Sequence, residues 1–495
     1  MDAMNLIPAI PELILTASLP ILMLLDLSVP QRHRDITFWL SLLIIAACAA
    51  GSAWLAGCCG SRAVTFYGAF IADAVAHVLK LCTYAAMFLT LVYARRYVNE
   101  RNLTTAYLGG AFYLLALFSL LGQMTVISAG DFLTLYLGIE LMTFPLYTLA
   151  ALKREDGNAV EAATKYFILG ALGTGLMLYG ISMVYGVTGS FRFAGIASAI
   201  SGQSTNGLVM VFGVVFIVCG IAFKLGAVPF HMWLPDVFEG VPTAVTLLVA
   251  GAPKLAGFAV CLRILGQGLL PMALDWQPML IVVSILSMAL GNLAAIMQKN
   301  IKRMLAYSTI SHMGYMLIGM LSGVRMTGEG GVSYTAYGAS MYYTVVYVLA
   351  SLGAFGVIMA LSQNGKEAEK LDDYKGLHRR NPWMALTMMV CMFSFAGVPP
   401  LVGFYGKVAV FQAAIDAGLT WLAVIGILFA VVGGFFYLRV VKFMYLDAPA
   451  DGSRVTVPKD TGIALLVNGA LIILFGVLPG PLMDWCIETV CLSFI

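Results

Sequence analysis

The stretch Gly220-Ile-Ala-Phe-Lys224-Leu-Gly-Ala-Val-Pro229-Phe-His231-Met-Trp-Leu-Pro235-Asp236, followed after a turn by Ala252-Pro253-Lys254, decides how this chain folds. It places two lysines inside apolar segments, each near a proline that interrupts a helix. A charged ammonium near the centre of a bilayer costs roughly 2.5–3.5 kcal/mol on insertion scales. Backbone carbonyls freed by a proline must face protein or water there. The pattern therefore predicts a hydrated intramembrane cavity that contains titratable lysines.

The composition of the whole chain is that of a membrane protein. Of 495 residues, 61% are hydrophobic and only 11% are charged, whereas soluble domains carry about 25% charged residues. The mean hydropathy is +0.91. Long apolar runs alternate with short polar loops, which favours helices over a β-barrel. The net charge of +3 does not indicate nucleic acid as a partner, because the basic residues flank the apolar runs.

The sequence predicts an all-α, polytopic membrane protein with about fourteen transmembrane helices. The expected spans are approximately 6–27, 36–57, 70–93, 104–122, 125–150, 161–186, 207–232, 243–265, 276–298, 303–322, 335–361, 383–414, 420–445 and 461–484. With this count, the loops on one side hold most of the basic residues, among them Arg32, Arg34 and Arg101. The other side carries only Arg62, Arg192 and Arg325. The positive-inside rule then places both termini outside the cytoplasm.

A weak internal symmetry relates two of the long spans. Ala227-Val228-Pro229 in the seventh span resembles Gly397-Val398-Pro399-Pro400 in the twelfth, and this odd difference of five positions would give the two copies opposite directions. This is the pattern of an inverted repeat with broken helices. We expect residues 1–103 to form an N-terminal three-helix segment, 104–265 and 276–445 to form two five-helix repeats, and 446–495 to carry a C-terminal helix.

Glu140 and Lys224 are the first candidate pair of functional residues. Glu140 is a carboxylate in the middle of a long apolar span, and Lys224 lies deep in the span that Pro229 breaks. A lone buried carboxylate would protonate, whereas a nearby lysine would keep it ionised. Such a pair is a controllable proton site, although a purely structural ion pair is the simpler alternative.

Four further residues fit the same chemistry. Lys254 follows Pro253 in mid-span, and Lys407 follows the second break. His312 lies in mid-span among hydroxyl residues, and an unperturbed imidazole titrates near 6.5. Lys165 is four residues after Glu161 on one helical face, where it can also simply extend to the membrane surface. The alternative for His312 is a hydrogen-bonded core histidine.

The remaining polar residues in the spans favour structural roles. Lys80 and His77 share a helical face with Asp73, outside the expected repeats, so packing is the favoured interpretation. We expect Arg263 to anchor its helix at the membrane interface. His231 either conducts protons or caps a helix. The nine cysteines form no C-x-x-C pair, which argues against a metal or iron–sulfur site.

The motifs together resemble a known family. Phe223-Lys224, Val228 to Asp236, Ala252-Pro253-Lys254 and Asn300-Ile-Lys-Arg-Met-Leu-Ala-Tyr-Ser308 with Ile310-Ser-His-Met-Gly-Tyr315 are similar to the antiporter-like subunits of respiratory complex I. The large subunits of multi-subunit sodium/proton antiporters belong to the same family. Gly138-Ile-Glu140-Leu, Ala163-Thr-Lys165-Tyr and Lys407 resemble the bacterial complex I branch.

The resemblance implies a proton-translocating membrane-arm subunit of NADH:quinone oxidoreductase in the bacterial inner membrane. It implies Glu140, Lys224, Lys254 and Lys407 as the translocating set, with Lys165 and His312 as associated groups. Other membrane subunits of the complex would be the partners. NADH, flavin, iron–sulfur clusters and quinone would bind those partners, and this chain would hold no cofactor.

Three alternatives share some of these features. A cation/proton antiporter that works without redox partners needs the same residues. A membrane cytochrome needs two facing histidines at similar depth, whereas His77, His231 and His312 are expected at different depths. An inert assembly subunit is disfavoured by the number of costly lysines.

Overall fold

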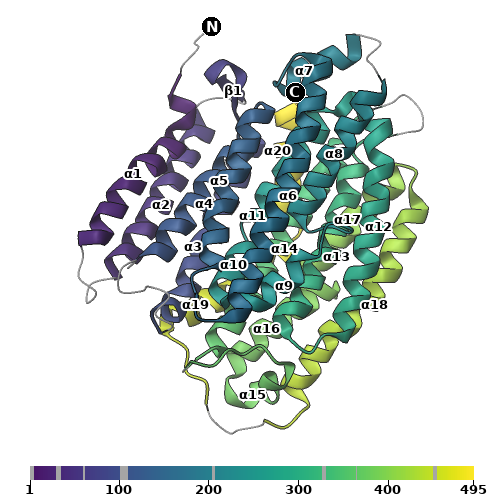
Figure 1. The fold of residues 1–495 in the computed structure, drawn as a ribbon. Coiled ribbons are helices and arrows are strands. Elements are labelled where there is room, and N and C mark those ends of the chain that lie inside the picture. Colours follow the sequence, from purple (N-terminus) through teal and green to yellow (C-terminus); the bar gives the residue numbers. More distant parts are fainter. Residues whose placement is uncertain are drawn as a thin grey trace.

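The structure is a computed structural model that describes residues 5–28, 35–58, 62–100, 110–202, 207–325, 331–363, 365–449 and 454–494. Arg32, Arg34 and Arg101, on which the charge argument rests, lie outside the described residues, as does Cys59, one of the nine cysteines. The chain forms one slab of roughly parallel and antiparallel helices (Figure 1).

The helices follow one another with short connections. The first part of the chain forms α1 (Ile10–Ser28), α2 (Asp35–Cys58), α3 (Ala74–Glu100), α4 (Ala111–Ile127), α5 (Phe132–Ala150), α6 (Gly157–Thr188) and α7 (Phe193–Gly202). The middle forms α8 (Gly207–Leu225), α9 (Trp233–Gly240), α10 (Thr243–Ala250), α11 (Pro253–Cys261), the π-helix η4 (Leu262–Gly268), α12 (Ala273–Met297) and α13 (Ile301–Leu321). The last part forms α14 (Tyr334–Leu361), α15 (Leu377–Arg380), α16 (Pro382–Ala396), α17 (Val402–Asp416), α18 (Thr420–Tyr445), α19 (Lys459–Val477) and α20 (Gly480–Phe494).

The all-α, polytopic membrane fold is confirmed. Within the described residues, 11 helices are long and apolar enough to cross a membrane. They coincide with eleven of the expected spans. The other three expected spans correspond to α4, α13 and the broken pair of α16 and α17. The start of α1 and the end of α20 lie at the same end of the slab (Figure 1).

Three elements were not anticipated from the sequence. A small antiparallel hairpin pairs β1 (Arg62–Thr65) with β2 (Phe70–Asp73) ahead of α3. The short helix α7 separates α6 from α8. The C-terminal segment, for which one helix was expected, contains both α19 and α20. The apolar-run criterion fails for these short elements because none of them alone is long enough to cross a bilayer.

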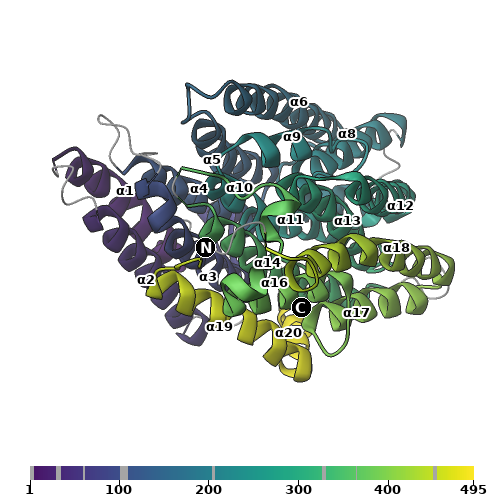
Figure 2. The ribbon, with the colours of Figure 1, turned by 90° about the horizontal axis from the view of Figure 1, so that it is seen from below.

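Helices α10, α11 and α14 form the centre of the bundle. In the apolar window of Thr243–Gly268, 94% of residues are buried, and the value for α14 is 83%, compared with 33% for α18. Viewed along the helices, α11, α14 and α16 occupy the middle, and α1, α6 and α18 lie at the periphery (Figure 2). The three N-terminal helices form one side of the molecule.

Helix breaks occur where the sequence places proline. Helix α8 ends at Leu225 and α9 begins at Trp233; Gly226, with φ of 77°, and Pro229 lie between them. Helix α16 ends at Ala396, and α17 begins after Gly397, with φ of 84°, and the two following prolines. A positive φ suits glycine, which has no Cβ. The inverted symmetry of the two halves and the domain boundaries remain predictions.

Arg263 is not an interface anchor, so that prediction was wrong. Its side chain is only 1% exposed, and its two terminal nitrogens donate to Asp73 at 2.6 and 2.8 Å. It also donates to the carbonyl of Ile127 at 3.2 Å. Arg263 therefore fastens η4 to the end of the hairpin and to the end of α4. The sequence did not reveal this because Asp73 is 190 residues away.

We expect the Arg263→Met variant to lower the free energy of unfolding by about 3–5 kcal/mol, because the buried carboxyl of Asp73 loses its cationic partner and two hydrogen bonds. Thermal unfolding in detergent measures the change. The matched control is Arg95→Met, whose partner Asp35 is 55% exposed; its cost should be about 1 kcal/mol or less. Equal losses of Tm in the two variants would contradict this interpretation.

Candidate functional site

Lys224 and Lys254 lie on one small internal cavity of about 30 Å³. Tyr166 from α6, Trp233 from α9 and Thr143 from α5 also line it. This space is sufficient for at least one water molecule that has polar neighbours. The breaks in two helices therefore bring the two lysines of the deciding stretch to one cavity.

Lys254 donates to the last backbone carbonyl of a broken helix. Its side chain is only 3% exposed, and its Nζ donates to the carbonyl of Leu225 at 3.0 Å. Leu225 is the final residue of α8, so this carbonyl has lost its partner in the next helical turn. The lysine thus places a positive charge at the negative end of a helix dipole.

Lys407 makes the same arrangement at the other break. It is 7% exposed, and its Nζ donates to the carbonyls of Phe395 and Ala396 at 2.8 and 2.9 Å. These residues end α16. The nitrogen also lies 5.3 Å from the centre of the Tyr315 ring. Each half of the chain therefore has one buried lysine on the carboxyl end of a broken helix.

Glu140 and Lys224 interact by Coulombic attraction but form no hydrogen bond. Glu140 Oε1 and Lys224 Nζ are both buried, and neither has a hydrogen-bond partner among the described residues. The two side chains as a whole are half-buried. The sequence prediction that they are electrostatic partners fits this placement, while a tight structural ion pair does not.

Glu140 lies in the middle of an exposed apolar stripe on α5. Leu133, Leu137 and Phe144, on the same helical face, are 45%, 65% and 53% exposed. The carboxylate is therefore at the edge of this chain, on a surface that meets either lipid or another protein.

His312 lies in a second cluster, which includes side chains that the sequence analysis missed. Its Nδ1 is 2.6 Å from the hydroxyl of Tyr343, and its Nε2 is 3.1 Å from the hydroxyl of Tyr437. Tyr437 in turn lies 2.5 Å from the hydroxyl of Ser308. The result is a continuous buried chain of groups that each can donate and accept a proton.

The only feature of the sequence that could have indicated Tyr343 and Tyr437 is a tyrosine inside an apolar helix. The chain contains 22 tyrosines, so this feature does not distinguish these two from the others. Both ring nitrogens of His312 are engaged by phenols, which leaves neither free to ligate a haem iron.

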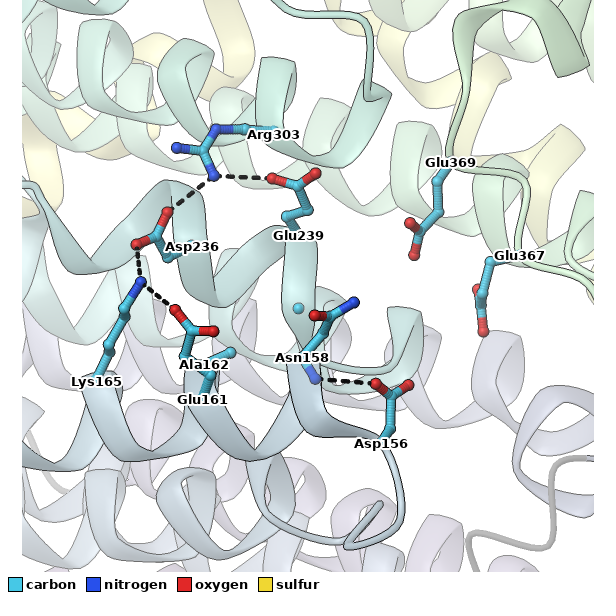
Figure 3. Close-up of a pocket in the computed structure, with 11 residues that line it drawn as sticks. Asp156, Asn158, Glu161, Ala162, Lys165, Asp236, Glu239, Arg303, Glu367 and Glu369 are labelled. Atoms are coloured by element: carbon cyan, nitrogen blue, oxygen red, sulfur yellow. Dashed lines mark hydrogen bonds and ion pairs between the residues drawn. The ribbon is translucent and has the colours of Figure 1, made fainter.

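Lys165 belongs to a separate pocket of about 390 Å³, which is lined mainly by charged side chains (Figure 3). Its Nζ contacts Glu161 at 2.7 Å, as the sequence spacing suggested, and Asp236 at 2.8 Å. Arg303 contacts Asp236 and Glu239, both at 2.8 Å. These ion pairs connect α6, α9 and α13.

The charge network lowers the pKa of Asp236. Partial burial raises this pKa, but the hydrogen bonds and charges of Lys165 and Arg303 outweigh it, so the pKa lies below its ordinary value. Lys165 therefore has two carboxylate partners at the surface of the bundle and does not line the cavity of Lys224 and Lys254. The next residue, Tyr166, does line that cavity, and its ring stacks on Trp233 with centroids 4.8 Å apart.

The six candidate residues thus fall into three groups. Glu140, Lys224 and Lys254 surround the first break, His312 and Lys407 surround the second, and Lys165 lies in the surface network. No hydrogen bond between described residues joins the first group to the second. His231 lies in the first break, half-buried, and its Nδ1 has no partner among the described residues.

Comparison with known proteins identifies the family. Residues 129–433 match the family described as NADH:quinone oxidoreductase/Mrp antiporter. The chain is 51% identical to NADH-quinone oxidoreductase subunit N of Herminiimonas arsenicoxydans, over 98% of both chains. It is 47% identical to the protein of the same name from Thiobacillus denitrificans, over 100% of this chain and 99% of that one.

Solved structures agree with this assignment. A chain of respiratory complex I from Thermus thermophilus is 31% identical, with a TM-score of 0.80 and coverage of 96% of this chain and 98% of that one. A chain of the Mrp complex from Dietzia sp. has a TM-score of 0.84 at 19% identity, over 99% and 98% of the two chains, and therefore shares the fold. The chain is a member of the NADH:quinone oxidoreductase/Mrp antiporter family, and it groups with the antiporter-like subunits N of bacterial respiratory complex I.

Proposed function

We propose that this multi-pass membrane protein translocates protons as subunit N in the membrane arm of bacterial NADH:quinone oxidoreductase. Quinone reduction in partner subunits drives the movement. NADH, flavin, iron–sulfur clusters and quinone bind those partners and not this chain. The complex lies in the inner membrane, and both termini of this chain are extracytoplasmic. The observation that carries the proposal is the pair of buried lysines, each capping a broken helix.

A lysine in this position can exchange a proton without losing its site. The ammonium donates to the freed carbonyls, and the neutral amine keeps two N–H bonds for the same acceptors while its lone pair faces the cavity. The broken helix therefore stays capped in both protonation states. A lysine paired with a buried carboxylate would lack this property, because loss of its proton would leave the carboxylate unpaired.

Glu140 is the group through which a charge outside this chain affects Lys224 and Lys254. It attracts Lys224 through space and lies on an exposed apolar face. A charge that approaches or leaves this face changes the energy of a proton on Lys224. Lys254, on the same cavity, then receives or supplies that proton through water.

His312 continues the pathway toward Lys407. Its hydrogen bonds to Tyr343 and Tyr437 allow a proton to enter on one ring nitrogen and leave from the other. Water completes the connections to Lys254 on one side and Lys407 on the other. Lys165 and Arg303 both bind Asp236 and so hold α9 in place. Helix α9 follows the break that begins directly after Lys224 and Leu225.

The second candidate function is a cation/proton antiporter that works without redox partners, which the shared fold with an Mrp complex favours. The two functions separate in liposomes that contain this chain alone. A pH jump should then produce no rapid cation-dependent exchange, whereas robust exchange by the isolated chain would favour the antiporter.

We expect the Lys254→Met variant, in the assembled complex, to slow proton transfer through this chain about 100-fold or more, the lower end of what one proton-transfer group contributes. The reason is that methionine cannot carry the proton. Quinone reduction should persist. Quenching of a pH-sensitive dye in membrane vesicles reports pumping, and NADH oxidation reports electron transfer. The matched control is Lys442→Met, which removes an exposed lysine from α18. Full pumping by Lys254→Met, or by Lys224→Ala, contradicts the proposal.

We expect the Tyr437→Phe variant to slow pumping at unchanged assembly, because the phenol between Ser308 and His312 is removed while its ring stays in place. The loss should be smaller than for Lys254→Met, since water can replace a hydroxyl. Tyr445→Phe, on the same helix near its end, is the control. If both variants pump like the unmodified complex, the His312 cluster is structural.

A further inference from the structure

A second group of buried titratable side chains lies outside the candidate site, at the last residue of β2 and along one face of α3, which follows it directly. Asp73, His77 and Lys80 follow one another at spacings of four and three residues, so they lie in a row. All three are buried; His77 is 6% and Lys80 1% exposed. The proposed function uses none of them.

The two ends of this row differ in how their charges are satisfied. Asp73 receives two hydrogen bonds from Arg263 and another from the backbone N–H of Ala76 at 2.8 Å. Lys80 has a single carboxylate partner, Glu12 of α1, with Nζ and Oε1 2.5 Å apart. The second oxygen of Glu12 is buried and has no hydrogen-bond partner among the described residues. Both carboxylate oxygens of Asp73 thus have hydrogen-bond partners, whereas one oxygen of Glu12 has none among the described residues.

His77 lies between the two ion pairs. It interacts electrostatically with Lys80 on one side and Asp73 on the other, and its Nδ1 is buried without a described partner. The other groups that face the Glu12–Lys80 pair are the thiol of Cys48 on α2, the hydroxyl of Tyr84 on α3, and the ring of Phe70, whose centre is 5.0 Å from the ammonium. None of these is charged in its usual state near neutral pH.

Glu12 is close to the surface from which a proton can arrive. It lies in the first turn of α1, and its side chain is 11% exposed. Leu6 and Ile7, just before that turn, are 52% and 48% exposed. The pair therefore lies near the end of the slab that also carries the end of α20 (Figure 1).

We propose that Glu12, His77 and Lys80 form a proton-binding site, separate from the lysine axis, that exchanges one proton with the side of the membrane where α1 begins. In the exchange a hydronium ion in the adjoining water breaks one of its O–H bonds and passes that proton to the free oxygen of Glu12. An O–H bond forms there, a water molecule is left behind, and the ion pair becomes a neutral acid beside an ammonium. The unpartnered Nδ1 of His77 is the alternative acceptor. No electrons move, and the reverse step returns the proton to water.

A purely structural pair would be built differently. A buried ion pair is costly unless further hydrogen bonds satisfy its remaining oxygens, and apolar residues of similar volume often serve as well or better. The Asp73–Arg263 pair meets that condition, 190 residues apart in sequence. The Glu12–Lys80 pair does not meet it, although it lies in the same row. This contrast within one row is what assigns the exchangeable proton to Glu12.

The test is infrared difference spectroscopy between about pH 8 and pH 5 on the assembled complex, with glutamate of this subunit carrying ¹³C in the carboxyl group. We expect the carbonyl stretch of a protonated carboxyl to appear on acidification and to shift in D₂O. The band should be absent in Glu12→Gln. In Lys80→Met it should be present at both pH values, because a buried carboxyl that has lost its cation protonates.

Two further samples make the outcome decisive. In a Lys254→Met background the band should persist, which separates this site from the lysine axis and from the proposed function. The double variant Glu12→Gln/Lys80→Met removes both charges together and lacks the band. Labelled unmodified complex that shows no pH-dependent carboxyl band, or a band that Glu12→Gln leaves unchanged, overturns the proposal even if a variant fails to assemble.

Discussion

Backbone carbonyls left open by broken helices are the constraint on which this structure depends. Inside a bilayer such carbonyls need a donor, because no bulk water is present to supply one. The chain supplies a lysine each time: Lys254 at the end of α8 and Lys407 at the end of α16. The break therefore favours a buried hydrogen-bond donor, and the freed carbonyls lower the cost of burying a lysine there. Each feature stabilises the other.

The local part of this arrangement is readable from sequence. A proline within an apolar run predicts where a helix stops, and a lysine nearby predicts a titratable amine beside the break. The ion pair of Lys165 and Glu161, which are four residues apart, is equally local. Which lysine covers the freed carbonyls is not local, because Lys254 and Leu225 are 29 residues apart. Span positions follow from apolar length alone, which is why eleven of them coincide with long helices.

Contacts between helices that are distant in the chain could not be predicted from the sequence, for a physical reason. Tyr343 and Tyr437, which hold His312, come from helices 31 and 125 residues away. Asp73 and Arg263 are 190 residues apart, so an arginine near a helix end looked like an interface anchor when it is a buried clamp. Partner choice across such distances depends on how helices pack, and hydropathy does not encode packing. The chemistry of each buried residue type was predictable, whereas its partner was not.

The buried charged groups differ in whether they have hydrogen-bond partners within this chain. Arg263, Lys254 and Lys407 are buried and donate hydrogen bonds to acceptors within this chain. Glu140 and Lys224 are the opposite case: their buried polar atoms lack partners among the described residues, and they lie where α5 presents an exposed apolar stripe. A buried carboxylate and ammonium that do not bond each other leave the local charge incomplete. It follows that this edge of the chain is the one most sensitive to charge on an adjoining surface. Lys254 and Lys407 are already held by backbone carbonyls. An external charge therefore acts on the buried lysines most effectively through Glu140 and Lys224.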